Sequence, residues 1–150
     1  MTKDEAFARL AQSKFRSRFR LNAADFDYID RVGMETIRRH AEDFVRTKLA
    51  PAEPEKDGRQ TPMRGHPVFK AMHGSAMCCR GCMEKWWKVP RGRPLSAAQR
   101  KKAVDFLLAW IERRRGEREH RGIPSDHAVL ETTAIRQKGT PAVQNLGQRR

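Results

Sequence analysis

The chain has 150 residues and a formal net charge of +14, because 32 Lys and Arg stand against 18 Asp and Glu. This length suits one domain, and a hydrophobic share of 38% supports a modest core. No apolar run is long enough to span a membrane, and the first residues lack the apolar core of a secretory signal, so we expect a cytoplasmic protein without membrane contact. The positive charge favours a polyanionic partner such as nucleic acid, although basic residues also serve simply to solvate helix faces.

The first third of the chain reads as three helices. Apolar residues at helical spacing predict the first over residues 4–17. Asn22 is a good N-cap and Gly33 a good helix end, which places a short second helix between them. The apolar stripe of the third covers residues 34–49, and Pro51 ends it.

A long loop and a broken helical segment follow. Residues 50–65 contain three prolines and two glycines without periodicity, and loops of this length are either functional or disordered. His66 and Pro67 then predict a helix with proline at its first position. Gly74 interrupts it, and a second segment runs to Trp87, ahead of Pro90.

The last predicted helix covers residues 97–115. Ser96 and Gln99 form a capping box directly before a clear apolar stripe. Residues 117–150 have no stripe long enough to pack, which predicts a disordered basic tail. No strand pair is visible, so we expect an all-α fold with a single small domain of four to five helices over residues 1–116.

Residues 66–82 hold all three cysteines and two of the five histidines, which suggests a metal centre. Cys79 and Cys82 have the C-x2-C spacing of zinc sites, and Cys78 lies four residues before Cys82. Cys78 and Cys79 diverge by about 100° around a helix, so all three thiols meet only where the backbone leaves helical geometry. Zinc is the favoured metal, with an iron–sulfur cluster as the alternative.

Histidine is the natural fourth ligand. His66 and His73 would be separated by about 10 Å along a straight helix, so they cannot bind one ion from a continuous helix. His73 is the first choice, since the Gly74 break lets it approach the thiols. His40 and His66 remain candidates that depend on the tertiary fold.

Other interpretations of this cluster stay open. Cysteine is among the most buried residue types, and the three thiols can be plain core filling in an interaction module. A thioredoxin-like redox role is weak, because the chain lacks a βαβ pattern. A metal- or thiol-dependent enzyme is also compatible, with a pocket under the 50–65 loop lined by Asp57, His66, His73 and the cysteines.

Two groups of arginines are candidate anion-binding residues. Arg91 and Arg93 lie in a loop that leads into a helix N-terminus, a geometry suited to phosphate or carboxylate. Arg38 and Arg39 lie side by side on the third predicted helix. Such residues favour nonspecific nucleic-acid binding, because no base-reading motif accompanies them.

Five blocks of the sequence resemble the small bacterial family catalogued as domain of unknown function 4186. In order, they are SKFRSRF (13–19), ETIRRHAEDF (35–44), LAPAEP (49–54), DGRQTPMRGHPVF (57–69) and CCRGC (78–82). The resemblance covers roughly residues 6–112 and brings no established activity. It implies that the domain ends near residue 115, that the long loop and the cysteines belong to the family pattern, and that Trp87 replaces a histidine found in relatives.

Overall fold

The structure is a computed structural model that describes residues 1–120. Within them it is all-α and has no strand, as predicted; it comprises six α-helices, where four to five were expected, and two short helical turns. The elements are α1 (Lys3–Ala11), the 3-10 turn η1 (Arg16–Arg18), α2 (Ala23–Val32), α3 (Met34–Phe44), the π-helical turn η2 (Val45–Leu49), α4 (Pro67–Gly74), α5 (Arg80–Trp87) and α6 (Ala97–His120). None of these helices is both long and apolar enough to cross a membrane.

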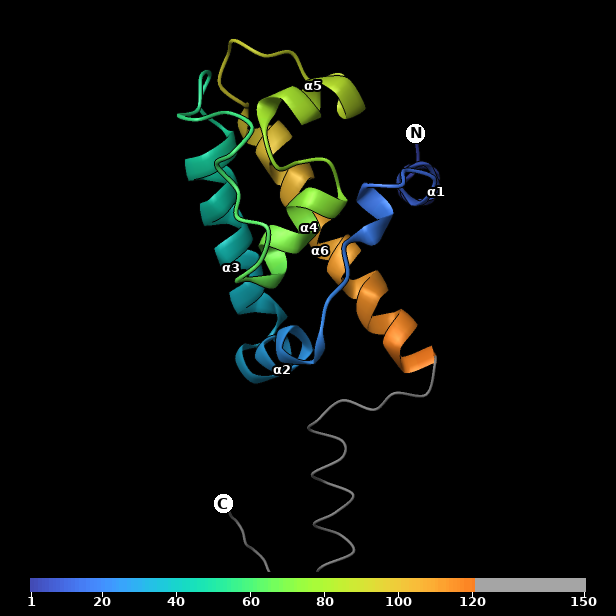
Figure 1. Ribbon diagram of the computed structural model, residues 1–150. Helices are drawn as coiled ribbons and strands as arrows, with labels where there is room; N and C mark the ends of the chain where they lie inside the picture. The colour runs from blue at the N-terminus through green and yellow to red at the C-terminus, as the bar shows by residue number, and fades with distance from the viewer. Residues whose placement is uncertain (121–150) are drawn as a thin grey trace, which may run out of the picture.

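The long helix α6 forms the back of the bundle, and α3 and α4 pack against it and against each other (Figure 1). Their apolar stripes meet in one core, which removes large side chains from water and supplies the main driving force for folding. The completely buried members include Ile37, Ala41, Val45, Leu49, Val68, Ala71, Met72, Leu107 and Ile111. At the end of α4, a Cβ on Gly74 would lie 2.8 Å from the Trp110 ring, so glycine is needed for α4 to lie this close to α6.

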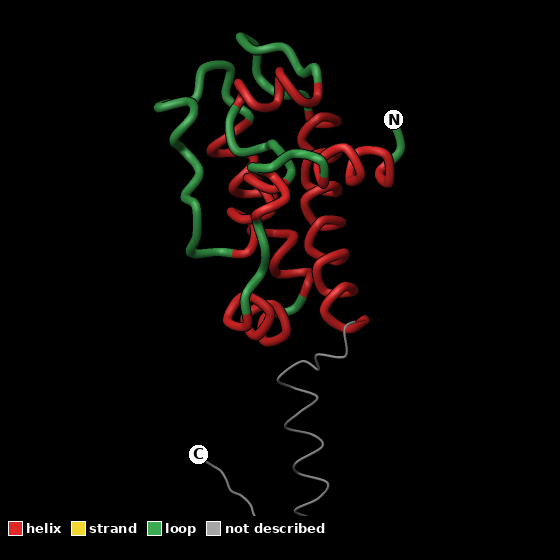
Figure 2. Tube along the Cα trace, turned by 45° about the vertical axis from the view of Figure 1, so that its right-hand side comes forward, coloured by secondary structure: helices red, strands yellow, loops and turns green. Residues whose placement is uncertain are grey.

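Two segments cross the outside of this bundle. The 50–66 loop returns from η2 along the length of α3 to the start of α4, as Figure 2 shows. From the other side, η1 packs on α4. Both segments therefore reach the region between α4 and α5, where the cysteines lie.

The predicted helix ends are confirmed by their hydrogen bonds. Asn22 and Asp25 form a capping box at the start of α2, which ends at Gly33. The Val68 amide donates to His66 Nδ1 at 3.0 Å, so His66 caps α4 with Pro67 at its first position. The amides of Ser96 and Gln99 each donate to the other's side chain, as in the expected capping box of α6.

Three helix boundaries differ from the prediction. The first helix ends at Ala11 and not at residue 17, and the chain forms the separate turn η1, because Arg16 turns into the interior. The predicted helix over residues 34–49 is α-helical only to Phe44 and continues as the π-helical turn η2. Helix α6 runs past Gly116 to His120, because the buried Arg118 lies 4.1 Å from the Phe26 ring and interacts with Asp30. Residues 121–150 of the predicted tail lie outside the described part of the chain.

The end of α5 generates a stability prediction. Lys88 is exposed and adopts the left-handed conformation, with φ of 58°, while its amide and that of Val89 close the last turn of α5. A non-glycine residue pays about 1–2 kcal/mol for this conformation. Lys88→Gly should therefore raise the free energy of unfolding by about 0.5–1 kcal/mol, after allowance for the greater freedom of glycine in the unfolded chain. Urea denaturation measures the change, and Lys85→Gly, inside the helix, should have the opposite sign.

Candidate metal centre

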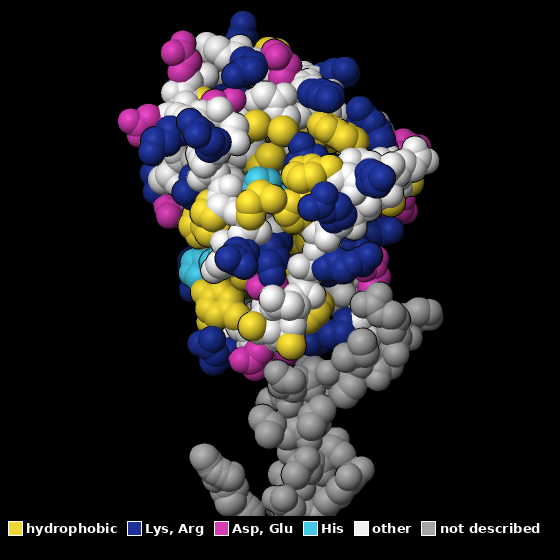
Figure 3. All heavy atoms as spheres, in the orientation of Figure 1, with side chains coloured by type: hydrophobic (Ala, Val, Ile, Leu, Met, Phe, Trp, Pro, Cys, Tyr) yellow, Lys and Arg dark blue, Asp and Glu magenta, His cyan; other side chains and the backbone are white. Residues whose placement is uncertain are grey.

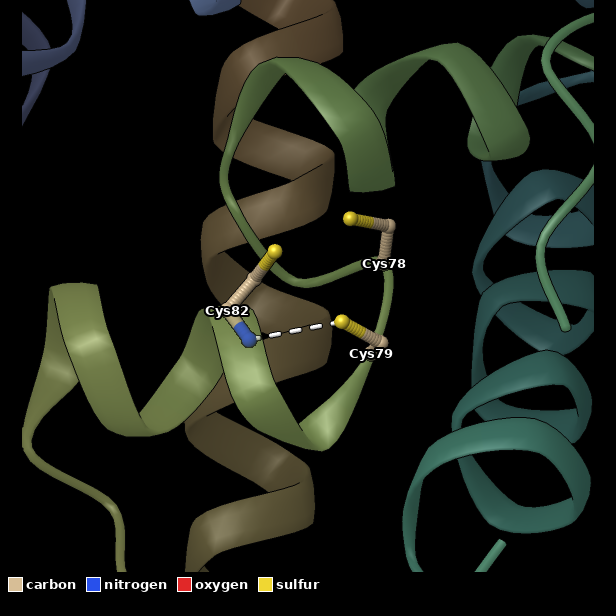
Figure 4. Close-up of side chains that lie close together, drawn as sticks. All are labelled: Cys78, Cys79 and Cys82. Carbon is tan, nitrogen blue, oxygen red and sulfur yellow. Dashed lines mark hydrogen bonds between the residues drawn. The ribbon is translucent and has the colours of Figure 1, made fainter. Parts of the chain in front are cut away.

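The three cysteine side chains converge on one another. Their sulfur atoms all lie within 4.8 Å of each other, and Figure 4 shows them turned toward a common space between α4 and α5. Cys78 and Cys79 are buried and Cys82 is partly buried, and no disulfide joins them. Within residues 1–120, no other set of three or more His, Cys, Asp or Glu side chains is placed to share one metal ion.

The convergence depends on where α5 begins. Cys79 is the N-cap of α5 and has extended backbone angles, so Cys78 precedes the helix and Cys82 lies in its first turn. The Cys82 amide donates a hydrogen bond to Cys79 Sγ at 3.3 Å. The backbone therefore departs from helical geometry at Cys79, which is the condition under which all three thiols can face one point.

The sulfurs have a buried cationic neighbour. The Arg16 guanidinium donates to Cys82 Sγ at 3.0 Å, to Cys78 Sγ at 3.6 Å and to the His73 carbonyl at 2.8 Å. Only 7% of Arg16 is exposed to solvent. Because its positive charge stabilises negative charge on sulfur, this residue favours the thiolate form that binds metals.

The thiols have unequal acidity. The hydrogen bond from Cys82 lowers the pKa of Cys78 against the opposing effect of burial, and Arg16 lowers it further. The same bond and burial raise the pKa of Cys82, since Cys82 is the donor to the Cys78 thiolate. Burial raises the pKa of Cys79. Of the three thiols, Cys78 therefore ionises most readily.

Beside the cluster, His73 presents a free ring nitrogen. Its Nε2 lies 3.0 Å from the Thr61 carbonyl, an acceptor, so Nε2 carries the proton. Nδ1 is buried and has no hydrogen-bond partner among the described residues. Burial lowers the pKa of His73, which keeps the imidazole neutral at pH 7. The ring stacks on Phe19, with 5.2 Å between the centroids.

The other two candidate histidines form a separate cluster. His40 Nδ1 lies 3.0 Å from His66 Nε2 and 3.5 Å from the Tyr28 hydroxyl. Because the Val68 amide donates to His66 Nδ1, the proton of His66 is on Nε2 and is donated to His40. The lone pair that a metal would need is thus engaged in each ring. The structure does not bring these two side chains together with the sulfurs.

A second buried arginine orders the chain around the site. Arg80 is 1% exposed, and its guanidinium donates to the carbonyls of Pro51, Pro90 and Arg93 at 2.8–2.9 Å. It thereby joins the start of the long loop and the segment before α6 to the first turn of α5. Since Arg80 lies between Cys79 and Cys82, these bonds also hold the C-x2-C backbone in place.

Asp57, from the middle of the long loop, caps the same helix. Its carboxylate accepts from the amides of Arg80 at 2.9 Å and Gly81 at 3.2 Å, and from the side chains of Gln60 and Arg91. Burial opposes ionisation, but these hydrogen bonds outweigh it and lower the pKa of Asp57. Asp57 is therefore an ionised helix cap, with its lone pairs already engaged.

Most of the candidate anion-binding arginines are already engaged in contacts within the fold. Arg91 forms an ion pair with Asp57 at 3.0 Å, and the Arg93 carbonyl accepts from Arg80. On α3, Arg38 pairs with Asp105 of α6, whereas Arg39 donates to the Thr36 hydroxyl. Trp87 donates its indole N–H to the Ser75 carbonyl at 2.9 Å and packs on Phe106.

Three residues that contact the candidate site, Arg16, Thr61 and Arg80, carry no signal in the sequence that points to this position. In the sequence, Arg16, Arg18 and Arg20 alternate with no difference in pattern, so nothing distinguishes the buried Arg16 from its neighbours. Arg80 is likewise marked only by its place between Cys79 and Cys82. No periodicity or spacing marks a polar residue that turns inward to bind carbonyls or sulfurs.

The histidine cluster generates a pH prediction. Burial, together with the charge of His40, lowers the pKa of His66 to about 4, whereas an unfolded histidine titrates near pH 6.5. Between these values the unfolded chain binds the proton first, so stability should fall as the pH drops from about 6.5 to about 4. We expect a loss of about 1–2 kcal/mol from this residue, since it is partly exposed. His66→Asn keeps a helix cap but removes the titrating imidazole. The free energy of unfolding of this variant, measured by urea denaturation, should therefore fall less steeply as the pH is lowered.

Comparison with known proteins agrees with the blocks quoted above. No solved structure matches the chain. A family model, however, matches residues 4–112, which covers most of the chain and includes every residue of the sulfur cluster and its surroundings. The chain therefore belongs to the family described as Domain of unknown function (DUF4186).

Proposed function

We propose that the protein binds one zinc ion through Cys78, Cys79 and Cys82. The observation that carries this proposal is the convergence of three sulfurs within 4.8 Å in a reduced, largely buried cluster. Thiolates are preferred ligands of zinc, and the C-x2-C spacing with an amide donating to the first sulfur suits a closed site. The buried guanidinium of Arg16, which donates to two of the sulfurs, also favours the thiolate form that metal binding requires.

The charges around the cluster fit a divalent cation. Three thiolates and Zn²⁺ together carry one negative charge, which is costly to bury without compensation. Arg16 supplies one positive charge at hydrogen-bond distance from two of the sulfurs. Hydrogen bonds from outer residues to ligands of this kind commonly tune metal affinity.

His73 is the proposed fourth ligand. Its Thr61 hydrogen bond fixes the tautomer that leaves Nδ1 free, which is the usual arrangement of a metal-binding histidine. Nδ1 is buried without a partner, so binding to a metal would remove an unfavourable state. Because His73 is outside the group of three sulfurs, its ring must move toward them for this bond to form.

The zinc is proposed to be structural and the basic surface to bind a polyanion such as nucleic acid. Asp57, the carboxylate expected in an enzyme pocket, is fully engaged in capping α5 and so is poorly placed to transfer protons. A net charge of +14 without a base-reading motif suits weak, sequence-tolerant binding. The alternative of an iron–sulfur cluster predicts visible absorption bands, which zinc lacks.

The first test is the metal content of the purified full-length protein. We expect one zinc per chain and a colourless solution. Removal of the metal by a chelator should lower the melting temperature by about 10 °C or more, because structural zinc contributes several kcal/mol to folding. Cys79→Ser and Cys82→Ser should each abolish stoichiometric zinc.

His40→Asn is the matched control for these variants, because His40 lies in the separate histidine cluster. It should keep one zinc per chain. A wild-type protein that contains no metal and binds none on titration with zinc under reducing conditions would contradict the proposal and favour a metal-free interaction module.

A second test concerns His73. His73→Ala should weaken zinc binding by about 100-fold, measured by competition with a chromophoric chelator, and should alter the visible spectrum of the cobalt-substituted protein. The spectrum separates loss of a ligand from loss of stability, since it reports the coordination shell directly. An unchanged spectrum and affinity would show that His73 is not a ligand.

A further inference from the structure

Several long stretches of the sequence contain no acidic residue, and two of them pack together in the fold. These two are residues 6–24, which include η1, and residues 58–83, which include the end of the long loop, α4 and the cysteines. The chain has 18 Asp and Glu, all of them outside these two stretches. When the two stretches lie next to each other, they therefore form a surface with little negative charge of its own. The fold does pair them, because η1 packs on α4.

His73 is the point at which the two stretches meet. Its ring stacks on Phe19 from the first stretch, and its Nε2 donates to the carbonyl of Thr61 from the second. Arg16 strengthens the junction through its bond to the His73 carbonyl. The face in Figure 3 has hydrophobic side chains and a histidine near its centre, Lys and Arg around them, and Asp and Glu mainly toward the edges.

Phe15 is the unusual residue of the first stretch. It is 40% exposed, although it is a large apolar side chain on a turn that the fold needs for Arg16. Its ring meets Phe19 edge-on, with 5.2 Å between the centroids, and Arg16 and Arg18 lie over it. The ring is thus held in one orientation while part of its surface stays open to solvent. Met63, 52% exposed, is the corresponding apolar residue of the second stretch.

The cations of the two stretches are available to a ligand. Several are exposed and form no ion pair within the described residues; they are Lys14, Arg18, Arg20, Arg59 and Arg64. By contrast, the basic residues of α6 are largely neutralised, as Lys101 is by Asp105 and Arg115 by Asp30 and Glu112. Unpaired cations around an exposed aromatic ring match the two needs of single-stranded nucleic acid, which are phosphate neutralisation and base stacking.

We infer that the face formed by residues 13–20 and 59–64 binds single-stranded nucleic acid, with a base stacked on Phe15 and phosphates on Lys14, Arg18, Arg20 and Arg64. A duplex is a poorer ligand, because its bases are already stacked and the short η1 turn offers no element to enter a groove. This inference rests on the proposed binding of a polyanion and adds its location and its strand form. It does not require any contact between the proposed zinc ion and the nucleic acid.

The test is a fluorescence anisotropy titration of the zinc-loaded full-length protein with a labelled 20-nucleotide single strand and the duplex of the same sequence, at several salt concentrations. We expect the single strand to bind at least several-fold more tightly. Phe15→Ala should weaken single-strand binding by about tenfold and leave duplex binding unchanged, while Phe15→Trp should restore it. Arg18→Ala should reduce the slope of log K against log salt by about 0.7, as expected for one lost phosphate contact.

Lys102→Ala removes an exposed lysine of α6 and is the control for total charge, with an expected effect below twofold. Melting curves of the Phe15 variants check the fold, which an exposed ring should hardly affect. If single strand and duplex bind equally and Phe15→Ala has no effect, the inference is wrong while polyanion binding stands. If neither the single strand nor the duplex binds at 20 mM salt, the nucleic-acid proposal and this inference are both wrong. The same holds if the protein binds only vesicles of anionic lipid. The zinc proposal is decided separately by the metal content.

Discussion

The arrangement of the cysteine cluster depends on one buried cation. Arg80 lies between Cys79 and Cys82, is almost completely buried, and has its guanidinium surrounded by backbone carbonyls from residues 49–51, 90 and 93. Such a group is very costly to bury unless its donors are satisfied. The surrounding loops therefore have to adopt one conformation, and the first turn of α5 is fixed with them.

Arg16 has the corresponding role on the opposite side of the cysteines. Unlike the exposed arginines on either side of it, Arg16 points inward and donates hydrogen bonds to two sulfurs and to the His73 carbonyl. The N-terminal arm is held over the cluster by this contact and by the stacking of Phe19 on His73. The long loop is attached in a similar way at two points. The Asp57 carboxylate accepts from the Arg80 amide, and the Thr61 carbonyl accepts from the His73 ring. A loop with no periodicity is thus ordered by polar groups and not by an apolar stripe.

The difference between elements fixed by local signals and segments fixed by distant polar contacts explains what the sequence could predict. Helix α2, the start of α4 and the start of α6 follow from local signals, namely Asn22, His66 with Pro67, and Ser96 with Gln99, and each has the expected cap. The three sulfurs follow from their spacing, given a backbone break that the cap at Cys79 supplies. Contacts between residues distant in sequence determine the features that the sequence did not predict. These are the separation of His40 from the cysteines, the inward turn of Arg16 and the continuation of α6 to His120. No local pattern encodes such contacts, because they depend on which helix faces meet.

The closeness of the three cysteines in the sequence has a consequence for the order of folding. The sulfurs span only residues 78–82, so bringing them around one ion closes a very short loop at little entropic cost, whereas the contact between Arg16 and Cys82 closes one of 66 residues. Under the proposed zinc binding, this short segment would therefore be able to capture the ion before the tertiary structure exists. Because Cys79 is also the N-cap of α5, such an early complex would preorganise the start of that helix. The arginines would then close around a centre that has already formed.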